Sequence, residues 1–438
     1  MFLKKKLRVL TFFSAMSFSV MSLSLQAANL LDVYNDAVRS DPVSIAAQLR
    51  VLDSEAQQQR AVSVLYPQAS LSGALSDNLL TGKSIPKDRY TGKSIKLNIN
   101  QVLFDLKAWR ENEKYKLLID KSSNDYRQAQ ADLIVKVVER YFAVLEAQDT
   151  LVLTKKNTTT INQNLKQLRA LYKRQLIPIT GVYEAEARYD LARSSEIEAN
   201  TALSVAFEKL YEVIAERVPE LSPIKEKLQF LEPDDSVEDW LALALENNFS
   251  LAASHSDVLA AKKEVAKKSA GYFPRLNLGF TQSRQDTGFD NSPRPQTDTS
   301  TIAISFSQPI YQGGGISAEK RQSVYRLGIA EQVEIESKRK VEQQLREYYL
   351  SLKSDVLKIQ ATKRLIDSEK KRAESMKAGF KYGTVTVNDV LDADTAYLKA
   401  QLEHQKAKYK YIIDQVKLKN TAGLIAEKDI IELNNWVQ

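Results

Sequence analysis

The sequence of 438 residues contains no cysteine and only two histidines, and it has few breakers of secondary structure, with 14 glycines and 11 prolines. The absence of cysteine excludes disulfide bonds and excludes lipid attachment through a cysteine. Beyond the N-terminal segment no run approaches 18 uncharged apolar residues, so spanning helices are not expected in the rest of the chain. Scarce glycine and proline, together with tracts rich in Gln, Ala, Lys, Glu and Leu, are typical of long helices.

The first residues have the pattern of a signal peptide. A basic start at Lys4 to Lys6 precedes an apolar stretch and the small residues Ala27 and Ala28. We predict that residues 1–27 are removed, with cleavage after Ala28 as the alternative and a membrane anchor as the competing interpretation. Without its four basic residues the balance is 62 − 4 = 58 basic against 55 acidic, a net charge of +3 instead of +7. Such a small excess does not indicate nucleic-acid binding.

An internal duplication organises the rest of the chain. The segment around Pro67 recurs around Pro274, and the segment that begins at Gln101 recurs at Gln308, in both cases 207 residues later (274 − 67 and 308 − 101). Three further residues recur at an offset of 208: Val182, Ala185 and Tyr189 match Val390, Ala393 and Tyr397. We therefore predict two structural repeats, 28–220 and 221–438, each running through short helices, two strands, a very long helix and a final helix.

Each repeat contains a pair of segments with period-two patterning. We predict strands at about 67–78 and 94–104 in the first repeat and at about 274–283 and 300–311 in the second, joined by polar loops at 79–91 and 285–299. Apolar residues such as Leu276, Leu278 and Phe280 alternate with small or polar ones over 9–11 residues. A tilted strand needs this length to cross a bilayer. Half-buried hairpins on a soluble core are the alternative.

Four strands cannot close a membrane barrel, and an open edge leaves backbone groups unsatisfied in lipid. We therefore expect the chain to oligomerise. A dimer supplies eight strands around a filled lumen, and a trimer supplies twelve strands around a pore. The strand pattern does not choose between them.

Two uninterrupted helices are predicted from residue 108 to about 174 and from 316 to 378. At 1.5 Å per residue each is about 90–100 Å long, so it must pair with neighbouring helices. The expected fold is mainly helical, with a membrane barrel joined to a long helical tube. A soluble, exported coiled-coil scaffold or adaptor is the alternative, although it would not need strands of membrane length.

No enzymatic constellation is visible. His255 and His404 lie in unrelated helical contexts, without the clustered partners that a metal site or a catalytic triad requires. Gly313 to Gly315 lie between a predicted strand and a helix, and we interpret them as a sharp turn. We expect no catalysis, no metal and no cofactor.

Several segments resemble the TolC family of outer-membrane efflux proteins. They are Gln101 to Asp105 with Trp109, Gln308 to Gly314, and Ala378 to Thr384 continued by Asp389 to Ala393. The resemblance implies a homotrimer in the outer membrane of a Gram-negative bacterium, with a twelve-stranded barrel, a periplasmic helical barrel and an equatorial collar. It also implies a periplasmic adaptor and an inner-membrane transporter as partners, and passive export of drugs, small molecules or type I secreted proteins.

Asp389 and Asp392 are the main candidate functional residues. They lie three residues apart at the start of the last long helix and so share one face. Helix N-terminal charges behind an Asn388 cap are the simpler interpretation, and a ring of carboxylates around a channel axis is the functional one. The resemblance favours the ring, because members of the family carry aspartates at these positions where the channel is narrowest.

The resemblance also implies a second restraint on the closed channel, made by an Arg and an Asp. Val385 and Gly181 stand at those positions, while Thr180 is present and Phe380 replaces a tyrosine. We therefore expect closure through the aspartates and apolar packing. The expected adaptor contacts are the tips of the helical hairpins, listed as Gln175, Leu176, Gly383 and Thr384, with Gln175 where the family usually has glycine.

Overall fold

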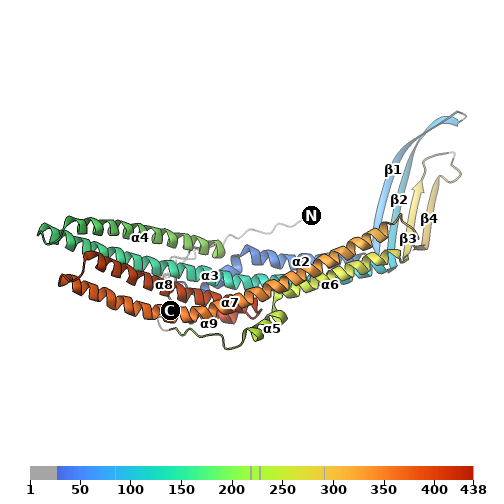
Figure 1. Ribbon diagram of the computed structural model, residues 1–438. Helices are drawn as coiled ribbons and strands as arrows, with labels where there is room; N and C mark the ends of the chain where they lie inside the picture. The colour runs from blue at the N-terminus through green and yellow to red at the C-terminus, as the bar shows by residue number, and fades with distance from the viewer. Residues whose placement is uncertain (1–26, 84, 218–219, 226–227, 291, 438) are drawn as a thin grey trace, which may run out of the picture.

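The structure is a computed structural model that describes residues 27–437, apart from 84, 218–219, 226–227 and 291. The signal peptide predicted at 1–27 lies outside the described residues, except for Ala27. The chain forms an elongated body with a sheet at one end and two helical turns at the other (Figure 1). Its elements are α1 (Leu30–Ser40), α2 (Pro42–Ser63), β1 (Gln68–Gly82), β2 (Ile85–Asp105), α3 (Leu106–Lys173), α4 (Ile179–Ile214), α5 (Val237–Asn247), α6 (Phe249–Ser269), a short 3₁₀ turn η1 (Ala270–Tyr272), β3 (Arg275–Asp286), β4 (Gln296–Ser307), α7 (Gly315–Lys381), α8 (Val387–Thr421) and α9 (Glu427–Asn434).

The duplication is visible in how the helices begin. Asn29 and Ser236, 207 residues apart, each form a capping box with an aspartate at the third position of the helix. Asp41 and Asn248, again 207 apart, each accept a hydrogen bond from a backbone N–H in the first turn of α2 or α6. Side-chain oxygens at this position satisfy amides that have no partner within the helix. Polar capping residues therefore start the same helices at equivalent positions in both repeats, although the residue types differ.

The four strands form one antiparallel sheet in the order β1-β2-β3-β4. The register pairs Leu71 with Leu97 and Leu278 with Ile304, so the apolar residues of all four strands share one face. On the outer strands these side chains are exposed in the single chain, Leu71 at 74% and Ile302 at 75%, whereas Leu97 and Leu278 on the inner strands are half-buried. An exposed apolar face alternating with a polar one is the pattern of a sheet that faces lipid on one side and a lumen on the other.

The strand ends differ from the prediction at three places. β1 and β2 continue through most of the expected loop at 79–91, because the cross-strand pairing persists and Arg89 pairs with Asp77 across the two strands. β3 and β4 likewise continue into the expected loop at 285–299, and only residues 287–295 are left between them. β4 ends at Ser307 and not at residue 311. Pro309, which has no N–H to donate, follows directly, and the next residue Ile310 is 84% exposed.

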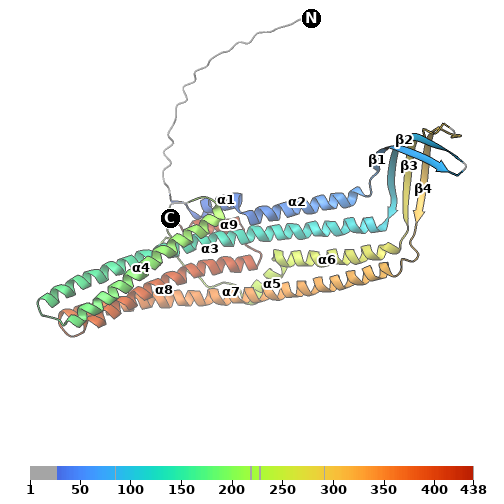
Figure 2. The same cartoon turned by 90° about the horizontal axis from the view of Figure 1, so that it is seen from above.

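Beyond the sheet, α2, α3, α6 and α7 run side by side toward the middle of the molecule (Figure 2). From there α4 accompanies α3 and α8 accompanies α7 to the far end. α3 spans 68 residues and α7 spans 67, which is about 100 Å each at the usual helical rise. The long helices predicted from 108 to about 174 and from 316 to 378 are thus present. α3 starts two residues earlier than expected and ends at Lys173, and α7 extends past both of its expected limits.

The main hydrophobic core lies where α1, α4, α8 and α9 meet α3 around its middle. Tyr141 and Phe142 are completely buried there and pack edge to face at 5.5 Å. The Tyr141 hydroxyl donates to the carbonyl of Ser222, and the Tyr409 hydroxyl donates to the carboxylate of Asp149 at 2.7 Å. This core, which we call the collar, joins the two repeats.

Both lateral edges of the protomer expose groups that need a partner. β1 and β4 each lack a partner on their outer side within the described chain. The outer helices carry exposed apolar side chains, among them Leu49 and Leu52 on α2, Leu191 and Ile197 on α4, and Tyr325 and Ile329 on α7. Unpaired strand edges in lipid and apolar helical edges in water are both costly. The protomer is therefore built to be completed on both sides by copies of itself.

Candidate constriction at the helical turns

Two short turns close the end of the molecule opposite the sheet, one between α3 and α4 and one between α7 and α8 (Figure 1). They have the same geometry. Leu176 N donates to Leu171 O and Thr384 N donates to Gly379 O, both at 3.0 Å, and the preceding residues Gln175 and Gly383 have φ angles of 59° and 73°. Glycine adopts this left-handed conformation freely, whereas glutamine adopts it with strain.

The residues proposed to meet an adaptor lie on these turns. Gln175, Gly383 and Thr384 are exposed, as is Leu176 at 65%. Thr384 also uses its hydroxyl to donate to the Gly379 carbonyl at 3.1 Å, which holds the second turn closed on itself. The four residues thus occupy two parallel, solvent-facing tips.

Asp389 belongs to the first turn of α8. Its Oδ2 accepts hydrogen bonds from the Thr386 backbone N–H at 2.8 Å and from the Thr386 hydroxyl at 2.6 Å, while the Asp389 N–H donates back to that hydroxyl. These bonds stabilise the carboxylate and lower the pKa of Asp389. The helix cap is therefore Thr386, and the Asn388 cap considered from the sequence is wrong, because α8 begins at Val387 and Asn388 already lies within it.

Asp392 lies one turn further along the same exposed face and has a different partner. Its Oδ1 accepts a hydrogen bond from Arg188 Nη2 at 2.6 Å. Arg188 belongs to α4, so this ion pair joins the two helical hairpins. Sequence reasoning missed Arg188, because a contact between residues 204 apart leaves no local pattern. The one available signal is an asymmetry: the equivalent position in the second repeat, 208 residues on, is Ala396.

The other proposed restraint residues are only partly brought together. Phe380 packs beside a small apolar cluster in which Leu391 of α8 meets Val182 and Ala185 of α4. A side-chain carbon at Gly181 would lie 3.9 Å from a methyl carbon of Val387, so this position of α4 faces α8 at van der Waals distance.

Val385 instead faces Gly379 within its own hairpin, where a side-chain carbon on that glycine would lie 3.2 Å away. Thr180 is exposed. Apolar packing therefore joins the hairpins, and Arg188 with Asp392 adds an ion pair between them that the sequence does not reveal.

Two further ion pairs lie near the same level, and each stays within one hairpin. Arg169 of α3 pairs with Glu186 of α4 at 2.6 Å, and Lys377 of α7 pairs with the buried Asp394 of α8 at 2.7 Å. Between residue 400 and the turn, the described chain shows one ion pair that crosses from hairpin to hairpin, that of Arg188 with Asp392.

Neither histidine belongs to a reactive cluster. His255 contacts Glu334 at 2.8 Å, and His404 contacts the Thr362 hydroxyl at 3.0 Å. Burial lowers the pKa of His404, helped by Lys408 and Lys363 nearby. Among the residues that the structure describes, no group of three or more His, Cys, Asp or Glu side chains could hold a metal ion.

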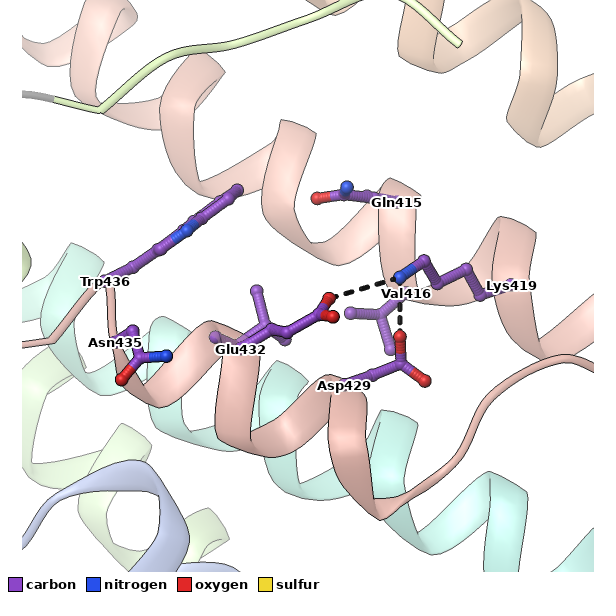
Figure 3. A pocket seen from close by; sticks show the side chains of 8 residues that line it. Gln415, Val416, Lys419, Asp429, Glu432, Asn435 and Trp436 are labelled. Atoms are coloured by element: carbon purple, nitrogen blue, oxygen red, sulfur yellow. Dashed lines mark hydrogen bonds and ion pairs between the residues drawn. The ribbon is translucent and has the colours of Figure 1, made fainter. Parts of the chain in front are cut away.

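A pocket in the collar is lined by α8, α9 and the residues after α9 (Figure 3). Lys419 crosses it and pairs with Asp429 at 2.5 Å and with Glu432 at 3.7 Å. These charges compensate one another, so the pocket supports the packing of α9 on α8.

Within the part of the chain that the structure describes, no helix is both long enough and apolar enough to cross a membrane. The sheet, with its lipid-type face, and the long helical hairpins define the protomer of a membrane channel with a helical extension. The model of the outer membrane efflux protein family matches residues 33–216 and 240–424, one match in each repeat. The chain belongs to this family.

Its relatives agree over almost the whole length. Outer membrane protein TolC of Escherichia coli is 30% identical over 451 residues, which cover 99% of this chain and 89% of TolC. The alkaline protease secretion protein AprF of Pseudomonas aeruginosa is 28% identical and covers 92% of this chain and 86% of its own. The Campylobacter jejuni CmeC outer membrane channel has the same fold, with a TM-score of 0.82 at 17% identity over 94% of this chain and 91% of its own.

These findings confirm the predicted fold class and the TolC resemblance. The protein is an outer-membrane efflux channel of a Gram-negative bacterium, in which each chain of a trimer contributes four strands to a barrel continuous with a periplasmic helical tube. The alternative of a soluble scaffold is wrong.

Proposed function

We propose that the helical turns form the narrow periplasmic entrance of the channel and that Asp389 and Asp392 line it. The observation that carries this proposal is that both carboxylates are exposed on one face of α8, at the end of the molecule furthest from the sheet. Three copies around one axis would bring six carboxylates together. Such rings attract cations and hold back anions.

Conductance of the purified trimer in a planar bilayer tests this assignment. Replacing both residues, Asp389→Asn with Asp392→Asn, keeps the side-chain volume and removes the charge. We expect a higher conductance and at least a tenfold weaker block by MgCl₂ added on the periplasmic side. If conductance and block are both unchanged in the double variant, the entrance lies elsewhere.

The two tips at Gln175–Leu176 and Gly383–Thr384 are proposed to dock a periplasmic adaptor that connects the channel to an inner-membrane transporter. They are exposed, parallel and furthest from the membrane, which is where a partner that completes the duct has to bind. The chain then acts as a passive conduit and not as an enzyme. The transporter determines the cargo, either small molecules or, as the name of AprF suggests for that relative, a secreted protein.

Because the chain has no cysteine, single cysteines can be introduced without altering the background. Leu176→Cys and Thr384→Cys should form crosslinks with a co-expressed adaptor through a short bifunctional maleimide. Thr299→Cys, exposed at the opposite end, is the matched control and should give none. A working pump complex in which only the control residue reacts would contradict the docking proposal.

A further inference from the structure

The Arg188–Asp392 ion pair places a positive charge beside one of the two carboxylates at the proposed entrance. Arg188 Nη2 lies 2.6 Å from Asp392 Oδ1, within the range of a strong charge-assisted hydrogen bond. Asp389, one turn away, accepts its hydrogen bonds from the hydroxyl and the amide of Thr386, which are both neutral. The two aspartates therefore share a helix face but differ in charge compensation.

The ion pair of Arg188 with Asp392 also links the two helical hairpins. It joins α4 to α8, whereas the neighbouring pairs Arg169–Glu186 and Lys377–Asp394 join helices within one hairpin. Near the turns of the described chain, the small apolar cluster around Val182 and Leu391 also joins the two hairpins. Any widening that separates α8 from α4 would have to break this ion pair.

We propose that Arg188 is a positioning residue that holds α8 against α4 in the narrow state and neutralises Asp392, so that cations bind at the entrance through Asp389. This inference rests on the proposed entrance. In a trimer, three guanidinium groups would offset three of the six carboxylates and leave the three from Asp389. A single exposed ion pair is weak, but three identical pairs must all break for a symmetric opening.

The proposal predicts opposite effects on two properties of the channel. Arg188→Gln removes the guanidinium charge, so α8 loses its tie and Asp392 becomes an uncompensated carboxylate. Conductance of the full trimer in a planar bilayer should rise severalfold, and the MgCl₂ concentration for half-block should fall severalfold. Asp392→Asn should raise conductance to a similar extent while leaving the half-blocking concentration close to that of the wild type.

Two further variants separate the contact between α4 and α8 from the negative charge of the entrance. Asp389→Asn should leave conductance near the wild-type value and weaken the MgCl₂ block at least tenfold. The exchange of Arg188→Asp with Asp392→Arg retains the pair with its polarity reversed, and it should restore the low conductance. Arg169→Gln is the matched control, because it removes an arginine at the same level whose partner lies in the same hairpin. It should change neither property.

All variants are compared as heat-stable trimers on gels, so that a failure to assemble is recognised before conductance is measured. If Arg188→Gln matches the wild type in conductance and in block, the role of Arg188 is refuted even when the Asp389→Asn/Asp392→Asn variant shows that the entrance is correct. If that double variant has no effect either, the entrance itself is wrong. If the charge exchange fails to lower conductance, the tie between α4 and α8 is refuted.

Discussion

The two repeats are nearly identical in the collar and differ at both ends of the molecule. In the collar, the caps Asn29 and Asp41 recur as Ser236 and Asn248 with the same hydrogen bonds. At the membrane end, β1 and β2 form a longer hairpin than β3 and β4. At the turns, Gln175 stands where the second repeat has Gly383, and the N-cap residue of α4, Pro178, makes no side-chain hydrogen bond, whereas α8 has a capping box. The shared scaffold is retained where the repeats pack on each other, and the differences lie at the sheet and at the helical turns.

The largest effect is expected on the lipid face of the sheet. Ile304→Arg places a charge among exposed apolar side chains that meet lipid, at a cost of about 2–4 kcal/mol per chain near the bilayer centre. Trimer yield in outer-membrane fractions should fall sharply. Ser305→Arg is the adjacent control on the polar face, where the charge can be hydrated. Equal losses for both variants would contradict the assignment of the faces.

Removing the paired caps should affect the two repeats unequally. Asn248→Ala loses a helix cap and also a buried hydrogen bond from Asn248 Nδ2 to the Thr421 carbonyl, so we expect a cost of about 2 kcal/mol. Asp41→Ala loses the equivalent cap, which is worth about 1 kcal/mol, and an ion pair with Lys136 whose atoms are 3.6 Å apart, too long for a hydrogen bond, so we expect the smaller cost here. Hydrogen exchange of the first turns of α6 and α2, measured by mass spectrometry, reports both costs. A larger effect in α2 than in α6 would reverse the comparison.

One substitution in each turn changes the backbone strain at the residue with a positive φ angle. Gln175→Gly removes the strain of a left-handed glutamine and should stabilise the first turn by about 1 kcal/mol. Gly383→Ala should destabilise the second turn by a similar amount, and its φ alone is responsible, because nothing lies within 4 Å of the added carbon. Slower exchange of the Leu176 amide in the first variant and faster exchange of the Thr384 amide in the second are the expected results.

The smallest effect is a pH dependence confined to one turn. Hydrogen bonds from Thr386 lower the pKa of Asp389 in the folded chain below its ordinary value. The cap therefore contributes stability above the ordinary pKa of an aspartate, and this stability is lost as the pH falls through the lowered value. The first turn of α8 should exchange faster in acid, after correction for intrinsic rates.

The first turn of α4 is the internal control for this measurement, since it has no side-chain cap and should show no such loss. Thr386→Ala removes the hydroxyl, and it should make exchange in the first turn of α8 as insensitive to acid as exchange in the first turn of α4. If α8 and α4 respond identically to acid in the wild type, the Asp389 cap does not stabilise the helix in this way.

Much of this architecture could be predicted because it depends on periodic patterns. The offset of 207 between Pro67 and Pro274, and the alternation in Leu276, Leu278 and Phe280, indicate the repeat and the strands directly. The strand ends were less predictable. Residues 79–91 read as a polar loop, yet cross-strand pairing such as that of Asp77 with Arg89 extends the hairpin through them.

The site was predictable only in part. The spacing of Asp389 and Asp392 puts them on one face of a helix, but it does not reveal what each carboxylate contacts. Thr386 as the cap follows from where α8 begins, which a sequence pattern locates only to within a few residues. The partner of Asp392 depends on how two hairpins from different repeats pack, and this packing is set by the tertiary structure alone.

The nearly equal lengths of α3 and α7 restrict how this chain can change. Each residue turns an α-helix by about 100°, so inserting one residue into α3 alone would rotate everything beyond it toward a different neighbour. Arg188, Gln175 and the apolar cluster around Val182 would then face away from α8. Insertions in these helices are therefore expected to occur in both repeats together and in multiples of seven, which keeps the two hairpins equal in length and preserves the contacting face. The tube can lengthen in steps of whole heptads, whereas the loops at its two ends can vary one residue at a time.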